Sequence, residues 1–278
     1  QNGKTGLEAL GNFYLLSSHV NLAEKVFNEL IGSKNVGDNI VTTLNLELQQ
    51  VASDALGDRR GAVIVMEPDT GKILAMVSKP DYDPNAIAEN WEALTADEAG
   101  EARLLNRAAQ GLYAPGSTFK ILTLLEYLRE HPEDYREFRF DCDGTYENGE
   151  YTIRCYHGEA HGSQDLTQAF ANSCNGAFAQ IGLSLDKAGF GELAEQLLYN
   201  RQLPLSLPYS ESSFAMTAEA DTWETLQTAI GQGRTQVTPV HQTMITAAIA
   251  NGGTLMKPYL IDRVESAGGQ EGKKFMPS

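Results

Sequence analysis

Ser117 and Lys120 are the two residues whose types and spacing best suit covalent chemistry in this sequence. They stand three positions apart in "GSTFKILTLL", where the apolar pattern is helical, so both side chains lie on one face and the amine can reach the hydroxyl. A serine hydroxyl becomes an effective nucleophile when a base removes its proton. A lysine can be that base once it is partly neutral, and burial, nearby positive charge and a helix N-terminus all lower its pKa. Because the same spacing also occurs on solvated helix surfaces, the pair alone does not assign a reaction.

A second polar segment, Ser173-Cys174-Asn175 within "ANSCNG", predicts a turn between helices. The Ser173 hydroxyl can relay a proton between Lys120 and a leaving amine, and the Asn175 amide can hold both Lys120 and a substrate carbonyl. Taken singly, this segment could be an ordinary helix-breaking turn. Taken after Ser117 and Lys120 in this order, it favours serine acyl transfer with Ser117, Lys120, Ser173 and Asn175 as the catalytic residues.

The apolar pattern predicts a mixed helical and sheet domain over residues 37–278, preceded by a helical lead-in over residues 1–36. In chain order, the expected elements are a strand from Ile40 to Leu44, a helix ending at Gly57, a hairpin in the middle of a sheet around Pro68 to Gly71, a helix led by Pro115 and Gly116, a helical region over 165–200, a helix capped by Thr238 with Pro239 in its first turn, and a strand over 255–264.

The charge balance of the chain limits its partners. Its 278 residues include 37 acidic and 21 basic side chains, and the formal charge of −16 repels nucleic acid and anionic lipid headgroups. No segment approaches the roughly 18 consecutive apolar residues that a membrane-spanning helix needs, and the first residues lack the pattern of a signal peptide. A membrane anchor is therefore expected outside this chain.

Two of the three cysteines flank a predicted hairpin and leave several states open. Cys142 and Cys155 enclose "DGTYENGEYTIR", so they could form a cross-strand disulfide or remain free thiols. A metal site built from these two cysteines with His157 and His161 must also be weighed. Because the spacing matches no common zinc motif, no metal ligand is predicted.

Four segments of the sequence resemble the penicillin-binding proteins, the serine acyltransferases that cross-link peptidoglycan. They are "GAVIVMEPDTGKILAMVSKPDYDPN", "APGSTFK" for the S-x-x-K motif, "NSCNGAFAQIG" for S-x-N, and "AIGQGRTQVTPVHQTMITAAIANGGTLMKPYL". The resemblance runs over most of residues 36–264 and is nearest to the transpeptidase domain of the large, membrane-anchored class B type. It implies an α+β fold in which an antiparallel β-sheet is flanked by helices, with a helical lobe.

The resemblance implies a D,D-transpeptidase that β-lactams also acylate. Ser117 would attack the carbonyl of a D-Ala-D-Ala stem peptide, Lys120 would be its general base, and the Ser117 backbone N–H would supply half of the oxyanion hole. The expected substrate contacts come from Gly116, Asn175 and Gln232. No cofactor is expected. The implied partners are peptidoglycan stem peptides, β-lactam antibiotics and proteins of either cell elongation or cell division, at the extracytoplasmic face of a bacterial membrane.

One part of the family pattern is missing. The third motif, K-T-G or a close variant, lies beyond the final helix in this family, whereas no such triplet follows "MKPYLIDRV" here. The domain is therefore expected to be incomplete at its C-terminal end. "GKTG" at residues 3–6 is not expected to replace the motif, because it runs directly into the helical pattern "LEALGNFYLL". It is not a phosphate-binding loop either, since that loop needs a glycine further upstream.

Two other functions remain open at the level of sequence. A non-catalytic β-lactam sensor or cell-wall scaffold would keep the fold without the third motif, although it would not need Ser117 and Lys120. A serine β-lactamase would share the nucleophile. However, the segment around Glu211 lacks the E-x-x-L-N pattern of class A enzymes, and Asn175 stands where class D enzymes carry an apolar residue.

Overall fold

A computed structural model describes residues 6–16, 30–31, 37–266 and 271–275. They form an α+β structure in which every paired strand of a sheet is antiparallel, as expected. The chain divides into two compact units. Unit 1 comprises the chain up to Gly111 together with Pro204–Ser210 and the chain from Thr238 onward, and unit 2 comprises Leu112–Leu203 and Glu211–Val237. Each unit is described by itself.

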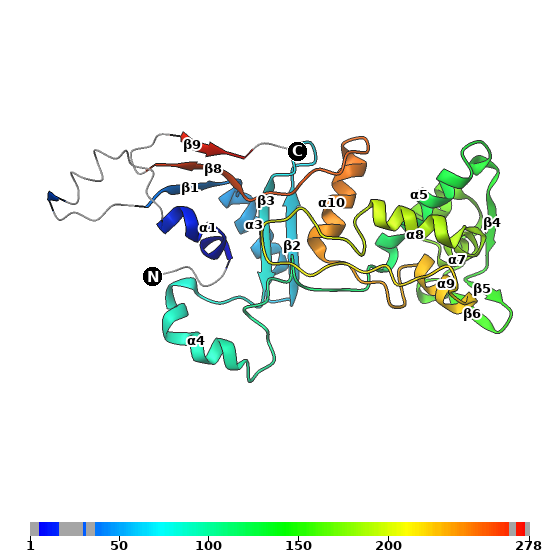
Figure 1. The fold of residues 1–278 in the computed structure, drawn as a ribbon. Helices are drawn as coiled ribbons and strands as arrows, with labels where there is room; N and C mark the ends of the chain where they lie inside the picture. Colours follow the sequence, from blue (N-terminus) through cyan, green and yellow to red (C-terminus); the bar gives the residue numbers. More distant parts are fainter. Residues whose placement is uncertain (1–5, 17–29, 32–36, 267–270, 276–278) are drawn as a thin grey trace. The chain divides into compact units, whose positions relative to one another are not determined.

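Unit 1 combines helices with two small sheets (Figure 1). Its elements are α1 (Gly6–Leu16), β1 (Asn39–Thr42), α3 (Leu46–Leu56), β2 (Gly61–Met66), β3 (Ile73–Lys79), the 3₁₀ turn η1 (Pro84–Ala86), α4 (Ile87–Ala96), α10 (Pro239–Ala250), β8 (Ile261–Glu265) and β9 (Glu271–Lys274). One sheet has the order β1-β8-β9, and the other is the hairpin β2-β3.

The β2-β3 hairpin forms where the sequence predicts it. Its turn places Gly71 at φ +79°, in the left-handed region that glycine adopts most readily, and the Gly71 N–H donates to the Glu67 carbonyl at 2.9 Å. Alternate residues of β3, Ile73, Ala75 and Val77, are buried, and α3 packs against the latter two through Ala52. The expectation that the hairpin lies in the middle of a sheet is not met among the described strands, where β2 pairs only with β3.

The ends of α10 follow the predicted capping chemistry. The Thr238 side chain accepts the His241 N–H, Pro239 occupies the first turn, and Asn251 is the C-cap. The Asn251 side chain then donates to the Pro68 carbonyl at 2.9 Å, which ties the end of α10 to the hairpin turn. The following strand begins at Ile261 rather than Leu255, because Pro258 lacks the N–H that a strand interior needs.

Unit 2 is a group of helices with two short two-stranded sheets (Figure 1). Its elements are η2 (Gly116–Phe119), α5 (Lys120–Glu130), η3 (Tyr135–Glu137), β4 (Arg139–Cys142), β5 (Thr145–Asn148), β6 (Tyr151–Arg154), η4 (Tyr156–Gly158), β7 (Gly162–Asp165), α6 (Leu166–Ala171), α7 (Asn175–Ser184), α8 (Lys187–Gln196) and α9 (Thr222–Ala229). β4 pairs with β7, and β5 pairs with β6.

Helix α7 forms the buried centre of unit 2. Phe178 and Ile181 are buried, and Gly182 lets α7 approach Ala229 of α9 so closely that a side chain at this glycine would overlap it. At the start of α7, Gly176 lies against the Phe140 ring, where an added Cβ would come within 2.9 Å. These contacts fix the N-terminus of α7, which carries Asn175, and therefore position the second predicted motif.

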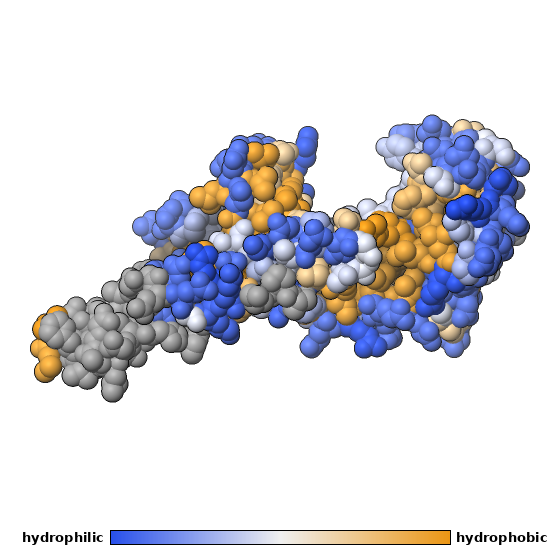
Figure 2. Space-filling model, turned by 90° about the horizontal axis from the view of Figure 1, so that it is seen from above, coloured by the Kyte–Doolittle hydropathy of each residue, from blue (hydrophilic) through white to orange (hydrophobic). Residues whose placement is uncertain are grey.

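The predicted lead-in over residues 1–36 is described only in part. Residues 6–16 form α1, as expected, whereas residues 17–29 and 32–36 lie outside the described residues, as do Lys4 and Thr5 of "GKTG". Among the residues that are described, no helix has the length and apolar character to cross a membrane. On the face of each unit seen in Figure 2, hydrophobic residues lie among hydrophilic ones.

Candidate active site

Ser117 lies exposed on the 3₁₀ turn η2, directly before α5. The turn is anchored by its neighbours: the Gly116 N–H donates to the Gly231 carbonyl at 2.8 Å, and the Thr118 hydroxyl donates to the Pro115 carbonyl at 2.7 Å. Gly116 and Gly231 both have positive φ, at +56° and +76°. The backbone therefore presents the serine hydroxyl at the surface of unit 2.

Phe119 holds the other side of this turn in the core. Its ring is fully buried, with ring centroids 6.0 Å from those of Phe190, Tyr199 and Phe214. One turn later, the Thr123 hydroxyl donates to the Ala229 carbonyl at 2.8 Å. The apolar residues of "FKILTLLEYL" thus bury one side of the helix start, while Ser117 stays accessible.

Lys120 is buried and brings the predicted residues together. Its Nζ lies 3.3 Å from Ser117 Oγ, 3.0 Å from Ser173 Oγ, 2.6 Å from the Ser173 carbonyl oxygen and 2.6 Å from Asn175 Oδ1. Burial lowers the pKa of Lys120 from 10.5 to about 8, although the neighbouring sulfurs of Cys174 and Cys155 oppose part of that shift. A lysine with this pKa is partly neutral near pH 7 and can accept a proton.

The second motif occupies the predicted turn between α6 and α7. Ser173 has φ +51°, an uncommon conformation for a residue with a side chain, and Cys174 is the N-cap of α7. The Asn175 side-chain N–H donates to the Arg154 carbonyl at 2.8 Å, so its Oδ1 is turned toward Lys120. The turn therefore supplies three oxygen atoms that hold the Lys120 amine: the carbonyl and hydroxyl oxygens of Ser173 and Oδ1 of Asn175.

A cavity of about 420 Å³ in unit 2 opens beside these groups. It is lined by Ser117, Ser173, Asn175 and Gln232, four of the six residues predicted for catalysis or substrate contact. Gly116 is the residue next to Ser117, and Lys120 lies beneath the cavity in contact with three of its lining residues. Further lining residues that the sequence did not single out for this cavity are Tyr156, Glu159, His161, Asn172 and Ile230. The clustered polar stretch "YHGEAH" is the signal that could have indicated three of them.

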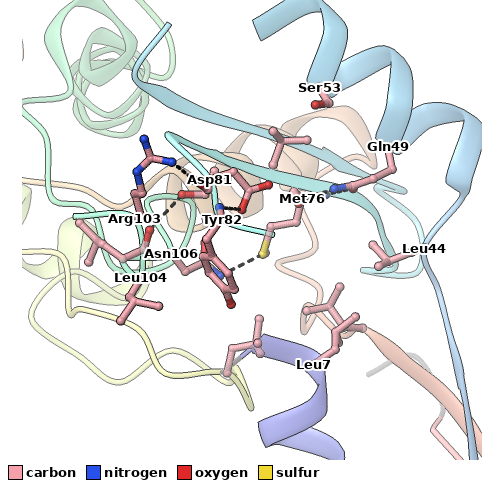
Figure 3. A pocket seen from close by; sticks show the side chains of 16 residues that line it. Leu7, Leu44, Gln49, Ser53, Met76, Asp81, Tyr82, Arg103, Leu104 and Asn106 are labelled. Carbon is pink, nitrogen blue, oxygen red and sulfur yellow. Dashed lines mark hydrogen bonds between the residues drawn. The ribbon is translucent and has the colours of Figure 1, made fainter. Parts of the chain in front are cut away.

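A second cavity, of about 270 Å³, lies in unit 1 and holds none of the predicted site residues (Figure 3). On one side, the Gln49 side-chain N–H donates to the Met76 carbonyl, and Gln49 Oε1 accepts the Met76 N–H, each at 2.8 Å. On the other side the Arg103 guanidinium donates to the Asp81 carbonyl at 2.9 Å. No serine–lysine pair lines this cavity, so the candidate active site is the cavity in unit 2.

The cysteines are free thiols, and their surroundings differ from the sequence expectation. Cys142 and Cys155 flank the β5-β6 hairpin as expected, with sulfur atoms 3.7 Å apart. The metal-ligand group weighed from the sequence joined these two residues to both histidines. In the structure, the group consists of Cys142, Cys155, His161 and Cys174. His157 lies outside it, with its ring against Tyr156.

Comparison with known proteins identifies the family of this chain. The family model for the penicillin-binding protein transpeptidase domain matches residues 61–277. The peptidoglycan D,D-transpeptidase PbpA of Mycolicibacterium smegmatis is 33% identical over 94% of this chain and 56% of its own length, and PbpA of Mycobacterium tuberculosis is 34% identical over 81% of this chain and 48% of its own length. This chain thus spans about half the length of these relatives.

Solved structures of penicillin-binding proteins also match this chain. Penicillin-binding protein A from M. tuberculosis, as its imipenem acyl-enzyme complex, has a TM-score of 0.87 at 29% identity over 99% of this chain and 66% of that chain. The D,D-transpeptidase domain of a peptidoglycan glycosyltransferase from Eggerthella lenta has a TM-score of 0.80 at 34% identity over 91% of this chain and 64% of that chain. These matches, together with a serine and an S-x-N turn that line one cavity above a buried lysine, show that the chain belongs to the family of penicillin-binding protein transpeptidase domains.

Proposed function

We propose that this chain carries the acylating centre of a peptidoglycan D,D-transpeptidase, with Ser117 as its nucleophile. The observation that carries the proposal is the Lys120 amine, which contacts the hydroxyls of Ser117 and Ser173 and the Asn175 amide at once. A buried amine with a lowered pKa beside an accessible serine suits general-base activation. The names of the relatives support the same reaction.

Acylation begins with proton transfer. Neutral Lys120 takes the proton of Ser117 Oγ as that oxygen attacks the carbonyl carbon of the penultimate D-alanine, and the carbonyl electrons move to its oxygen. The Ser117 backbone N–H stabilises this oxyanion. When the intermediate collapses, the C–N bond to the terminal D-alanine breaks, and the leaving nitrogen takes a proton from Lys120 through the Ser173 hydroxyl.

Transpeptidation reverses these proton movements. An amine from a neighbouring peptidoglycan strand attacks the ester carbonyl and gives up one proton to Lys120. Lys120 then returns this proton to Ser117 Oγ as the ester bond breaks. Asn175 holds the lysine through Oδ1 while its N–H group is bonded to Arg154, so its orientation is fixed in both steps. Gly116 and Gln232 border the serine and are proposed as substrate contacts.

The cellular setting follows the same proposal. Peptidoglycan lies outside the cell membrane, so we place this activity at the extracytoplasmic face of a bacterial membrane. The proposed partners are stem peptides, β-lactams that mimic them, and proteins of cell elongation or division. The acidic surface of the chain disfavours nucleic acid as a partner.

Covalent capture by benzylpenicillin tests this function. Opening of the β-lactam ring releases no leaving group, so the mass of the protein should increase by that of the whole antibiotic. Peptide mapping should place the adduct on Ser117. Ser117→Ala should abolish the adduct, whereas Ser163→Ala, which removes an exposed hydroxyl on β7, should leave it unchanged.

The same samples distinguish catalysis from simple binding. Incubation with a peptide ending in D-Ala-D-Ala should release D-alanine from the wild type and not from Ser117→Ala. An adduct that persists in Ser117→Ala would overturn the assignment of the nucleophile. A folded wild-type protein that forms no adduct and releases no D-alanine would favour the sensor or scaffold.

A further inference from the structure

Three thiols and one imidazole meet beside the candidate active site. Cys142 ends β4, Cys155 follows β6, His161 precedes β7, and Cys174 lies between α6 and α7. Although these four residues come from separate segments, one donor atom from each lies within 4.8 Å of all the others. All four belong to unit 2, and the β5-β6 hairpin connects the first two.

The separations of the donor atoms fit a tetrahedral metal centre. With metal–sulfur bonds of about 2.3 Å, two thiolates of a tetrahedron lie about 3.8 Å apart, and a thiolate and an imidazole nitrogen lie about 3.5 Å apart. Here Cys142 Sγ is 3.7 Å from Cys155 Sγ, Cys155 Sγ is 3.8 Å from Cys174 Sγ, and Cys142 Sγ is 3.3 Å from His161 Nδ1. These three separations match those around a shared central ion, and the other three donor pairs lie within 4.8 Å.

The same distances argue against a disulfide as the purpose of this arrangement. A disulfide needs its sulfur atoms about 2.05 Å apart and joins only two of them. Cys155 is nearly equidistant from Cys142 and Cys174, so neither partner is preferred. Either bond would also leave one thiol and the His161 ring without a role in the cluster.

The environment of the cluster is that of a closed structural site. The three cysteines are buried, with 3%, 4% and 0% of the surface of Cys142, Cys155 and Cys174 exposed, and His161 is half-buried. The Ala177 N–H donates to Cys174 Sγ at 3.5 Å. Four protein donors complete the coordination of a tetrahedral ion and leave no open position for a substrate.

We propose that Cys142, Cys155, Cys174 and His161 bind one zinc ion in a structural site. Thiolates are soft ligands that select zinc over calcium or magnesium, and zinc accepts three sulfurs and one nitrogen in tetrahedral geometry. On binding, each cysteine loses its proton to solvent and His161 ligates through neutral Nδ1, so three protons are released for each ion bound. The centre then carries a net charge of −1.

The site has a consequence for the second motif, and this consequence rests on the proposed function. Cys174 stands between Ser173 and Asn175, the two residues whose oxygens hold the Lys120 amine. Since Ser173 adopts φ +51°, the turn needs support from its surroundings. A metal bond at Cys174 would tie this turn to β4 and β6, so the ion is a positioning element for acylation and not a participant in it.

Metal stoichiometry tests the site directly. Protein purified without a metal-binding tag, incubated with Zn²⁺ and dialysed should retain about one zinc per chain. Replacement by Co²⁺ should give the thiolate charge-transfer band and the intense visible bands of a tetrahedral cobalt centre. Less than about 0.1 zinc per chain in the folded wild type, or a cysteine pair lighter by two hydrogens, would overturn the proposal.

Two histidine variants form the matched comparison. His161→Asn should lower zinc retention at least tenfold and weaken the cobalt spectrum, whereas His157→Asn should retain both, because His157 lies outside the cluster. Circular dichroism checks that each variant is folded. If His161→Asn does not fold, thiol titration of the zinc-loaded wild type takes its place. The three thiols should react only after a strong chelator is added. Equal reactivity with and without the chelator would contradict the site.

The acylation assay separates this inference from the proposed function. If chelation removes zinc and slows penicillin adduct formation at Ser117, both stand. If zinc binds stoichiometrically and no adduct ever forms, the metal site stands and the proposed function fails. If acylation is unchanged after the zinc has been removed completely, the positioning role is wrong.

Discussion

Lys120 is the residue on which the proposed chemistry depends. Replacing it with methionine keeps an unbranched apolar stem in the buried position and removes the amine that contacts Ser117, Ser173 and Asn175. We expect Lys120→Met to slow acylation by a fluorescent penicillin by about 10²–10⁴-fold, the usual contribution of a general base. The measurement is the second-order rate of adduct formation.

Lys187→Met is the control for this change. Its amine donates to the Ala220 carbonyl, so the variant also loses a lysine hydrogen bond but not one at the site. Its acylation rate should match the wild type. Equal rates for Lys120→Met and the wild type would show that another group activates Ser117.

The pKa of Lys120 predicts the pH dependence of acylation. Burial lowers this pKa to about 8, and only the neutral amine can accept the Ser117 proton. The acylation rate should therefore fall about tenfold for each pH unit below roughly 8 and become level above it. A rate that stays constant between pH 6 and pH 8 would contradict the role of Lys120 as the base.

The turn η2 depends on the loop around Gly231 and Gly233, and these two glycines form a natural matched pair. Both have positive φ, at +76° and +77°. A Cβ at Gly231 would overlap the Gly116 carbonyl, whereas a Cβ at Gly233 would have the Gln227 side chain at 3.5 Å as its nearest neighbour. Gly231→Ala should therefore displace the backbone that carries Ser117.

Comparison of the two variants isolates that displacement. Gly233→Ala should lower the free energy of unfolding by about 1 kcal/mol through backbone strain alone. Gly231→Ala should cost about 1–3 kcal/mol more and slow acylation as well. Thermal or urea unfolding and adduct kinetics measure both effects. Equal losses in the two variants would mean that the contact with Gly116 is unimportant.

The elements also show how far the sequence could predict this structure. The ends of α10, the hairpin turn and the pairing of Ser117 with Lys120 depend on residues close together in the chain, so spacing and capping chemistry were sufficient. The inclusion of Cys174 and the exclusion of His157 from the thiol cluster depend on where four separate segments meet. No local sequence pattern predicts that these segments come together. The start of the last strand is the opposite case, because a single residue, Pro258, decides where that strand begins.

At the scale of the whole molecule, the division into two units predicts how a ligand acts on stability. The proposed active-site cavity is lined entirely by residues of unit 2. Acylation by benzylpenicillin should therefore slow amide hydrogen exchange mainly within residues 112–203 and 211–237, because bound ligands stabilise the structure that they contact. Hydrogen-exchange mass spectrometry measures the change peptide by peptide.

Ser117→Ala treated with the same antibiotic is the control for this experiment. It should show little change in either unit, because it cannot retain the ligand covalently. An equal slowing of exchange over residues 37–111 in the wild type would show that the ligand stabilises the chain as one cooperative body.

The Gln49 amide has a consequence for how this protein behaves among other chains. β3 pairs with β2, and the backbone N–H and C=O of Met76 on β3 are both bonded to the Gln49 side chain of α3. The Asn45 N–H occupies the Leu74 carbonyl in the same way. Open strand edges recruit strands from other molecules and lead to aggregation. By occupying this edge with groups of its own chain, the protein protects the hairpin from intermolecular strand addition on that side.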